Sequence, residues 1–196
     1  ILDITDQALK DALAETCDHQ SFIAGAPMVL VFCADCKKWY DAYREAGCDP
    51  RAPGVGDLML AFSDAAIAAQ NAVVAAESLG LGSCYIGDIM ENCARQRALL
   101  HLPEYVFPAV MLVFGWPTPQ QRERPKPQRC PMAHIVHQNT YRSMDGAELR
   151  DMLAHNCGAR PFEEWCAAFC ERKYNSDFSR EMTRSVAEYL RQFQRG

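Results

Sequence analysis

The chain has 196 residues, of which 49% are hydrophobic and 23% are charged, and its formal net charge is −5. This composition supports a folded core and argues against an intrinsically disordered chain. The acidic balance argues against nucleic acid or an anionic membrane as a partner. We see no secretory signal, and the chain begins with Ile1 rather than Met. We therefore expect a cytoplasmic protein whose first residues were cleaved, disordered or left out.

The first part of the chain alternates between helical and strand-like patterns. It predicts, in order, a helix at 5–15, a strand at 26–35, a helix at 36–47 and a turn-rich loop at 48–56. Thr5 or Asp6 supplies the N-cap of the first helix, and Gly47 stops the second. The strand is an unbroken apolar run, which is typical of burial on both faces.

Residues 57–80 form one long apolar stretch that predicts a central helix. Asp57 caps it and Gly80 ends it, so its length is roughly 34 Å at the usual rise per residue. Because it is apolar on most faces, we expect a helix buried in a protein core rather than one in a membrane. One such face suits a subunit interface.

The second part of the chain is mostly helical. It predicts a short strand or turn at 83–89, a helix at 91–100, a strand at 106–117, extended chain at 118–141, and helices at 145–156, 162–173 and 177–193. Asp145 and Glu148 have the spacing of a capping box. Few strands and many helices indicate an α+β or α/β fold.

Two segments are candidate binding elements. In "SLGLGSCYIGDI", Gly82 and Gly87 flank a short apolar strand, and a glycine at a strand end can bring a backbone amide against a flat ring. A helix precedes this segment, so it is not a dinucleotide-binding glycine motif. In "RERPKPQRCP", four basic residues lie among stiffening prolines. That segment is either a solvated linker or a strand able to hold a phosphate.

The ten cysteines leave a different class of function open. Cys33 and Cys36 form a CxxC pair with Cys48 nearby, and Cys166 and Cys170 share one helical face. A second pair at zinc-like spacing is missing, so reduced thiols packed as small hydrophobes are the simpler interpretation. A cysteine-based metal or redox-sensing protein remains the alternative from another class, and we assign no metal ligand.

Taken in order, the segments resemble the FMN-dependent nitroreductase family. The similarity rests on "FIAGAPMVLVFCAD", "DAAIAAQNAVVAAESLGLGSCYIGDIMEN", "LPEYVFPAVMLVFGWP", "RPKPQRCPMAHIVHQNTYR" and the clostridial-type ending "RKYNSDFSREMTRSVAEYL". The resemblance implies an α+β fold with a central mixed or antiparallel sheet wrapped by helices. It also implies a homodimer with long helices across the two-fold axis and FMN at each interface. We expect a flavin-binding core at 1–142 and a helical extension at 143–196.

The resemblance assigns the binding residues. Its flavin-side loop corresponds to Tyr85, Ile86, Gly87 and Asp88, and the amide of Gly87 or Asp88 would approach flavin N5. Many members have a second glycine where this chain has Asp88. Two further residues, Lys126 and Arg129, would hold the phosphate or the flavin O2 edge, although Gln128 lengthens the usual Lys-Pro-Arg pattern.

By the same resemblance, the activity is NAD(P)H-dependent reduction of nitroaromatics, quinones or similar small acceptors by a ping-pong mechanism, with no catalytic side chain. A specialised flavin reductase, ene reductase or dehalogenase is the alternative within the family, with residues 48–56 as a candidate pocket rim. The family's Arg-Arg-Ser segment would come before Ile1, and residues 1–196 do not include it. A cofactor-free binding protein is therefore a third possibility.

Overall fold

The computed structural model describes residues 1–194. By their contacts, these residues form two compact units: Ile1–Thr118 together with the chain from Glu181 onward, and Pro119–Arg180. The expected division into 1–142 and 143–196 stays a prediction.

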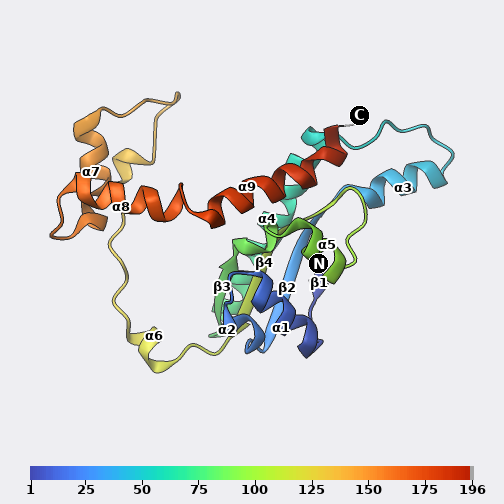
Figure 1. The fold of residues 1–196 in the computed structure, drawn as a ribbon, viewed down its shortest axis with the longest axis horizontal. Helices are drawn as coiled ribbons and strands as arrows, with labels where there is room; N and C mark the ends of the chain where they lie inside the picture. The colour runs from blue at the N-terminus through green and yellow to red at the C-terminus, as the bar shows by residue number, and fades with distance from the viewer. Residues whose placement is uncertain (195–196) are drawn as a thin grey trace. The chain divides into compact units, whose positions relative to one another are not determined.

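The first unit is built on an antiparallel sheet (Figure 1). Among the described residues its strands are β1 (Leu2–Asp3), β2 (Met28–Asp35), β3 (Gly82–Ile86) and β4 (Val106–Gly115), in the order β1-β2-β4-β3. Each neighbouring pair is antiparallel. The predicted α+β class is confirmed, and the sheet is antiparallel rather than mixed. The apolar strands β2 and β4 lie in the centre because both of their faces are covered.

One face of the sheet is covered by short helices. These are α1 (Gln7–Thr16), α2 (Ser21–Ala24), the 3₁₀ turn η1 (Gly87–Met90) and α5 (Cys93–Leu99). Apolar side chains of α1, α2 and η1, and Leu100 just after α5, form one core cluster with Val29, Val31 and Met111 of the central strands. Asp6 is the N-cap of α1, as predicted, and its carboxylate accepts a hydrogen bond from the Leu9 amide at 2.7 Å.

The other face is covered by α4 (Val55–Ser78), α9 (Asp177–Leu190) and the 3₁₀ turn η3 (Arg191–Gln194). The predicted end of α4 is confirmed, because Gly80 has φ +77° just beyond it. The predicted cap is corrected: Gly54 is the N-cap, and Asp57 lies in the first turn and accepts the Gly54 amide at 2.8 Å. The acid at this position satisfies the amide of the N-cap residue, which is one half of a capping box.

The outer face of α4 is exposed to solvent in the single chain. The helix is long and apolar enough to cross a membrane by length and composition, and only 17% of its apolar window is buried. The inner residues Leu58, Ala65 and Ala69 pack against the sheet. The expectation of a helix buried on most faces is therefore not met within one copy of the chain.

Between β2 and α4 lies α3 (Lys37–Glu45), which ends before Gly47 (φ +77°) as predicted. It is largely exposed, and none of its own residues is buried.

The second unit contains α6 (Pro119–Glu123), the 3₁₀ turn η2 (Met132–His134), α7 (Gly146–Cys157) and α8 (Phe162–Lys173). The predicted capping box of α7 is confirmed: Asp145 accepts the Glu148 amide at 2.9 Å, and Glu148 accepts the Asp145 amide at 3.0 Å. The prediction of extended chain through 118–141 is corrected by α6 and η2. Pro119 presets the dihedral of a first helical residue, and good helix formers follow it.

Candidate functional site

The predicted flavin-side residues form the end of β3 and the beginning of η1. Ile86 is 1% exposed and belongs to the core, whereas Tyr85 is 43% exposed. The Tyr85 hydroxyl donates a hydrogen bond to Oε1 of Gln70 on α4 at 3.1 Å. The side chains of Tyr85 and Ile86 thus fix the strand end in place, and the backbone that follows is left for other contacts.

Gly87 is not required by the packing of the described chain. Its φ is not positive, and a Cβ built on it would meet no described atom within 4 Å. The amides of Gly87 and Asp88 come first in η1, where a helical turn provides no acceptor for its N–H groups. Open space therefore lies beside Gly87, at the start of the turn, where the first N–H groups of a helix lack acceptors within the helix.

The far end of the turn is held firmly by residues from distant parts of the chain. Asn92 has left-handed backbone (φ 51°), and its side-chain amide donates to the Thr16 carbonyl at 2.9 Å. Its backbone amide donates to Glu181 on α9 at 3.1 Å. The Cys93 amide donates to Oγ of Ser185 at 2.9 Å. Two side chains of α9 therefore cap the first turn of α5.

The α9 cap is itself supported. Arg184 donates two hydrogen bonds to the Glu181 carboxylate, at 2.7 and 2.6 Å. The Ser185 hydroxyl donates to the same carboxylate at 2.8 Å. The Arg184 guanidinium, more than any other contact, lowers the pKa of Glu181 to about 2. Glu181 thus stays ionised at any physiological pH. Sequence reasoning missed Glu181 and Ser185, since neither belongs to a local motif with α5.

Lys126 and Arg129 lie in the second unit, in exposed chain between α6 and η2. Within residues 1–194 neither side chain forms an ion pair. Both cations are therefore available to an anion. Their contact with the turn at Gly87, in the same chain or in a second copy, stays a prediction.

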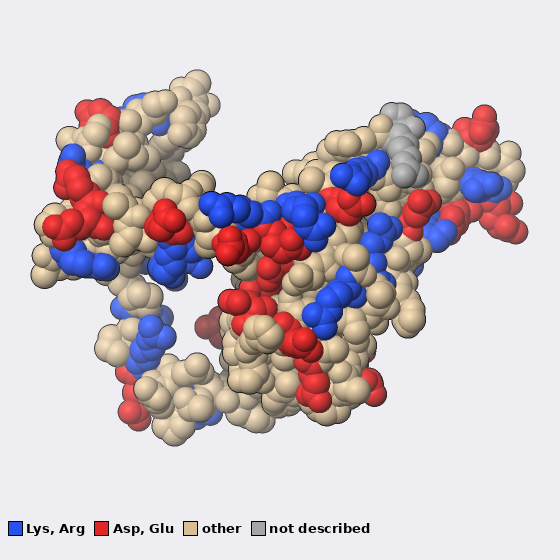
Figure 2. All heavy atoms as spheres, in the orientation of Figure 1, with Lys and Arg blue, Asp and Glu red and all other residues tan. Residues whose placement is uncertain are grey.

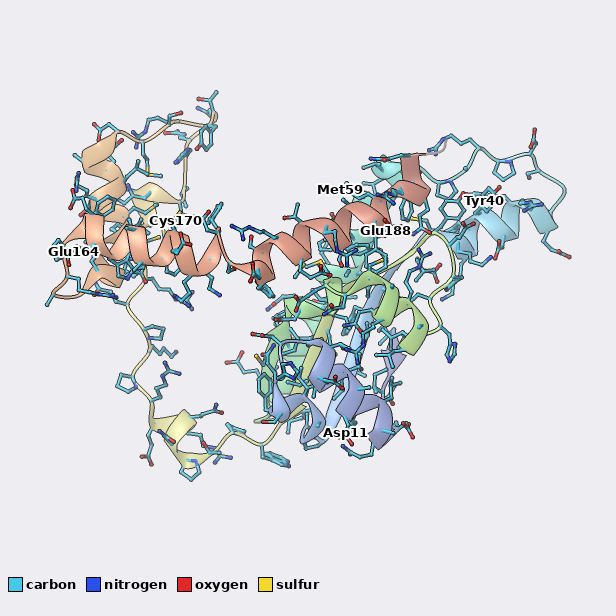
Figure 3. All side chains as sticks on the ribbon, in the orientation of Figure 1. Asp11, Tyr40, Met59, Glu164, Cys170 and Glu188 are labelled. Atoms are coloured by element: carbon cyan, nitrogen blue, oxygen red, sulfur yellow. The ribbon has the colours of Figure 1, made fainter. Side chains whose placement is uncertain are left out.

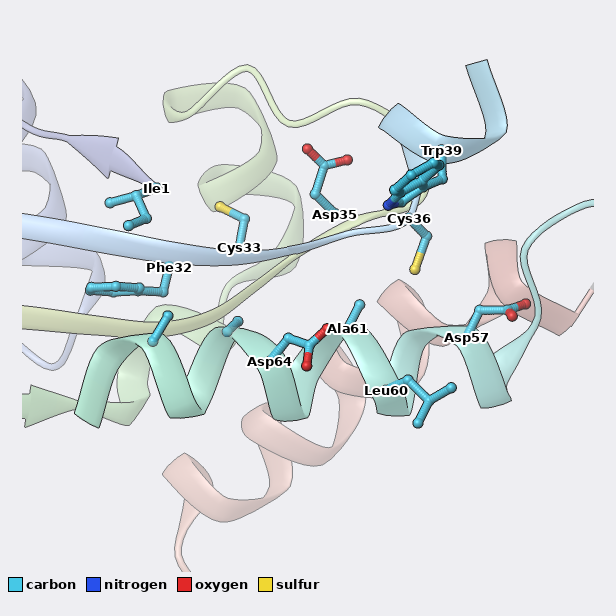
Figure 4. A pocket seen from close by; sticks show the side chains of 12 residues that line it. Ile1, Phe32, Cys33, Asp35, Cys36, Trp39, Asp57, Leu60, Ala61 and Asp64 are labelled. Carbon is cyan, nitrogen blue, oxygen red and sulfur yellow. The ribbon is translucent and has the colours of Figure 1, made fainter. Parts of the chain in front are cut away.

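A separate cavity of about 440 Å³ lies where β2, α3 and α4 meet (Figure 4). Trp39 lies over Cys36 in this view, and Asp64 reaches the cavity from α4. A neighbouring cavity of about 260 Å³ is lined by Tyr40, labelled on α3 in Figure 3, and by Pro50 and Pro53. Residues 48–56 therefore do border a pocket, but none of the six predicted binding residues lines either cavity.

Both cavities share Asp57. Its carboxylate receives two hydrogen bonds from Arg51, at 2.6 and 2.9 Å. This contact is the main reason that the pKa of Asp57 is lowered to about 2. The pair fixes the loop at 48–56 on the first turn of α4, which is a structural role.

The sequence of this chain is similar to the sequences of known proteins. A model described as Nitroreductase family matches residues 2–116, more than half of the chain. The chain belongs to the nitroreductase family. It is 38% identical over 145 residues to an "Oxygen-insensitive NADPH nitroreductase" of Salmonella typhimurium, covering 74% of this chain and 58% of that protein. It is 30% identical over 191 residues to an "FMN reductase [NAD(P)H]" of Bacillus subtilis, covering 96% and 72%.

Solved structures agree with this placement. A putative oxidoreductase of Bacteroides fragilis superimposes with a TM-score of 0.85 at 27% identity, covering 98% of this chain and 82% of that one. The nitroreductase fold is therefore the fold of this chain. The chain nevertheless spans less than two thirds of its Salmonella relative.

The cysteine alternative finds little support in this member of the nitroreductase family. Residues 1–194 contain no group of three or more His, Cys, Asp or Glu side chains arranged to hold a metal ion. Burial raises the pKa of both Cys33 and Cys36 to about 11. Thiols that stay protonated at neutral pH are poor ligands and poor nucleophiles. The CxxC pair is best explained as packing at the end of β2.

Proposed function

We propose that this protein is an NAD(P)H-dependent FMN oxidoreductase that reduces small, flat, electron-poor acceptors such as nitroaromatics and quinones. The observation that carries the proposal is the turn Gly87–Met90: open space lies beside its first residue, and α9 holds Asn92 and Cys93, which follow the turn. Membership of the nitroreductase family and relatives named as NADPH nitroreductase and FMN reductase support it.

The residues present fit a flavin. When bound, FMN would supply the hydride-transfer chemistry. The amide of Gly87 or Asp88 would donate a hydrogen bond to the ring edge, and the bond between Tyr85 and Gln70 keeps that amide in place. Lys126 and Arg129 would supply positive charge to the phosphate or to the O2 edge. No side chain of this chain has to act as an acid, base or nucleophile.

We further propose that the protein acts as a cytoplasmic homodimer joined through α4. Leu60, Ile67 and Val74 are spaced by seven residues, so they form one stripe along the helix. They are 71%, 62% and 56% exposed and lie opposite the residues that pack on the sheet. An apolar stripe of this length on a helix that already packs on a sheet suits a second copy of the same helix.

The first test is an absorbance spectrum of the purified full chain, with added FMN. We expect flavin bands at about one FMN per subunit that bleach on addition of NADH or NADPH. A protein that stays colourless after incubation with FMN would contradict the proposed function.

The second test weakens the anion contacts. Lys126→Ala and Arg129→Ala should each weaken FMN binding about tenfold or more, because a hydrogen bond to a charged group contributes roughly 1.5–3 kcal/mol. The matched control is Arg124→Ala, a cation in the same exposed segment. Fluorescence titration of FMN measures the dissociation constants. Equal weakening in all three variants would mean that the segment attracts anions only by its total charge.

A further inference from the structure

The helix α3 carries three aromatic residues, Trp39, Tyr40 and Tyr43, that do not enter the core of the described chain. None of the residues of α3 is buried, and Trp39 and Tyr43 are 68% and 47% exposed. These two lie one helical turn apart, and their ring centres are 5.8 Å from each other. A group of exposed aromatic rings, unlike a single one, is typical of a binding surface.

The smaller cavity, of about 260 Å³, lies between this helix and the loop at 48–56. Tyr40 and Tyr43 line it from α3, and Pro50 and Pro53 line it from the loop. Cys36, the N-cap residue of α3, lines it as well. Two tyrosine rings and two proline rings give the cavity largely apolar walls, as in most sites for small molecules.

The loop wall of the cavity is held in place without a ligand. The two hydrogen bonds from Arg51 to Asp57 fix the middle of the loop to α4. Asp57 also accepts the amide of Gly54, at 2.8 Å. Pro50 and Pro53 restrict the backbone further. A ligand that enters this cavity therefore does not have to order the loop, and this saves binding free energy.

The helix wall is held through a strained residue, Tyr105. Its backbone is left-handed (φ 61°), which is rare for a bulky side chain. Its amide donates to Oε1 of Gln192 at 3.0 Å, and its carbonyl accepts the amide of Cys36 at 3.1 Å. Its ring meets Tyr40 edge-on, with ring centres 5.7 Å apart. Strained backbone persists only where its surroundings hold it, and it is concentrated at binding and active sites.

Size and charge limit what the cavity can hold. An apolar cavity of about 150 Å³ is large enough for benzene, so about 260 Å³ suits one ring with small substituents and excludes a whole flavin nucleotide. The charged residues that line it, Arg51 and Asp57, form an ion pair with each other. On the face shown in Figure 2, acidic and basic side chains are interspersed over α3. The surroundings therefore favour a neutral ligand.

Two hydroxyl groups at the cavity are available for a polar substituent. The hydroxyls of Tyr85 and Tyr189 donate hydrogen bonds within the described chain, whereas within residues 1–194 those of Tyr40 and Tyr43 do not. A tyrosine hydroxyl can donate to an oxygen of a nitro group or of a quinone carbonyl. The ring of such a compound would pack on the apolar walls.

The cavity is separate from the turn at Gly87 within one copy of the chain. The strand β2, which leads to Cys36, ends at Asp35 opposite Val106 of β4. The strand β3, which leads to Gly87, ends at Ile86 opposite Met111. These two positions on β4 are about five residues, or about 17 Å, apart.

We propose that the cavity between α3 and the loop at 48–56 is a second small-molecule site, which binds a neutral single-ring aromatic compound that carries a nitro group or a quinone carbonyl. The ring packs against the tyrosine and proline rings, and a tyrosine hydroxyl donates to the substituent. That such a compound is also the electron acceptor of the enzyme rests on the proposed function. Binding in the cavity is a property of the chain without FMN.

Fluorine NMR with 3-fluoronitrobenzene as the probe tests the site in the full chain without FMN. We expect saturable binding of about one probe per chain. Tyr43→Ala removes part of the helix wall and should raise the dissociation constant about tenfold. The matched control is Phe22→Ala, because Phe22 is also 47% exposed but lies on α2, across the sheet. Absence of saturable binding, or equal weakening in the two variants, would overturn the proposal.

The double variant Tyr40→Phe, Tyr43→Phe isolates the hydroxyl groups. It keeps both rings and removes no hydrogen bond within residues 1–194, so folding should be unaffected. Binding of 3-fluoronitrobenzene should weaken about threefold or more, since a neutral hydrogen bond is lost. Fluorobenzene has no nitro group, and its binding should not change. Equal changes for the two probes would show that the hydroxyls do not recognise the substituent.

An FMN titration of the same samples separates this proposal from the proposed function. A chain that binds 3-fluoronitrobenzene in a Tyr43-dependent way but binds no FMN would refute the proposed function and support the cavity as a site. A chain that binds FMN and oxidises NADPH, yet shows no saturable binding of the probe, would overturn the cavity site and leave the proposed function standing.

Discussion

Replacing Ile67 with aspartate is expected to convert dimers of this protein into monomers. Ile67 is 62% exposed in the single chain and lies at the middle of the stripe formed with Leu60 and Val74. In a symmetric interface the substitution would bury two unpaired charges next to each other, because each copy contributes the same residue. Burying a charge without a partner costs several kcal/mol. We therefore expect the dimer dissociation constant to rise at least about a thousandfold.

The matched control for Ile67→Asp is Phe22→Asp. Phe22 is an apolar residue of α2, 47% exposed, on the opposite face of the sheet from α4. It should leave the dimer intact. Analytical ultracentrifugation over a range of protein concentrations measures both variants and the wild type. A wild type that is monomeric at all concentrations, or an Ile67→Asp variant that stays dimeric, would exclude α4 as the interface.

The signals that were predicted correctly from the sequence are local ones. An unbroken apolar run identified β4, which is buried along nearly its whole length. The spacing of Asp145 and Glu148 identified the start of α7 because a capping box involves residues only three positions apart. In the same way, the glycine after Ile86 correctly marked the end of a strand.

What the sequence could not reveal is the support of the turn by distant residues. Asn92 and Glu181 are 89 positions apart, and Cys93 and Ser185 are 92 positions apart. No periodicity or motif connects such pairs; only the return of α9 to the sheet brings them together.

The helix α4 shows a different limit. Its composition correctly indicated a helix with several close neighbours, but the hydropathy of a helix cannot tell which of those neighbours belong to the same chain. The inner stripe at Leu58, Ala65 and Ala69 is satisfied by the sheet. The outer stripe at Leu60, Ile67 and Val74 is exposed in a single copy of the chain, which leaves it without an apolar surface to pack on.

Tyr189 anchors α9 to the sheet, and deleting its side chain is expected to destabilise the protein strongly. Tyr189 is fully buried, and its ring packs edge-on against Phe107 of β4 with ring centres 4.9 Å apart. Arg97 lies over the same ring at 5.9 Å. Deleting a buried aromatic ring typically costs about 3–5 kcal/mol, so Tyr189→Ala should lower the melting temperature by roughly 10 °C.

Tyr189→Phe separates the ring from the hydroxyl group. The hydroxyl donates only a long hydrogen bond, 3.5 Å, to the Cys93 carbonyl, so its loss should cost less than about 1.5 kcal/mol. Both variants must be compared with the wild type at one protein concentration, since dimerisation adds to apparent stability. Because α9 carries Glu181 and Ser185, Tyr189→Ala should also expose the amides of Asn92 and Cys93 to exchange, whereas Tyr189→Phe should not. If Tyr189→Ala melts within about 2 °C of the wild type with those amides still protected, α9 does not support the turn, and the turn is held by α1 and the sheet alone.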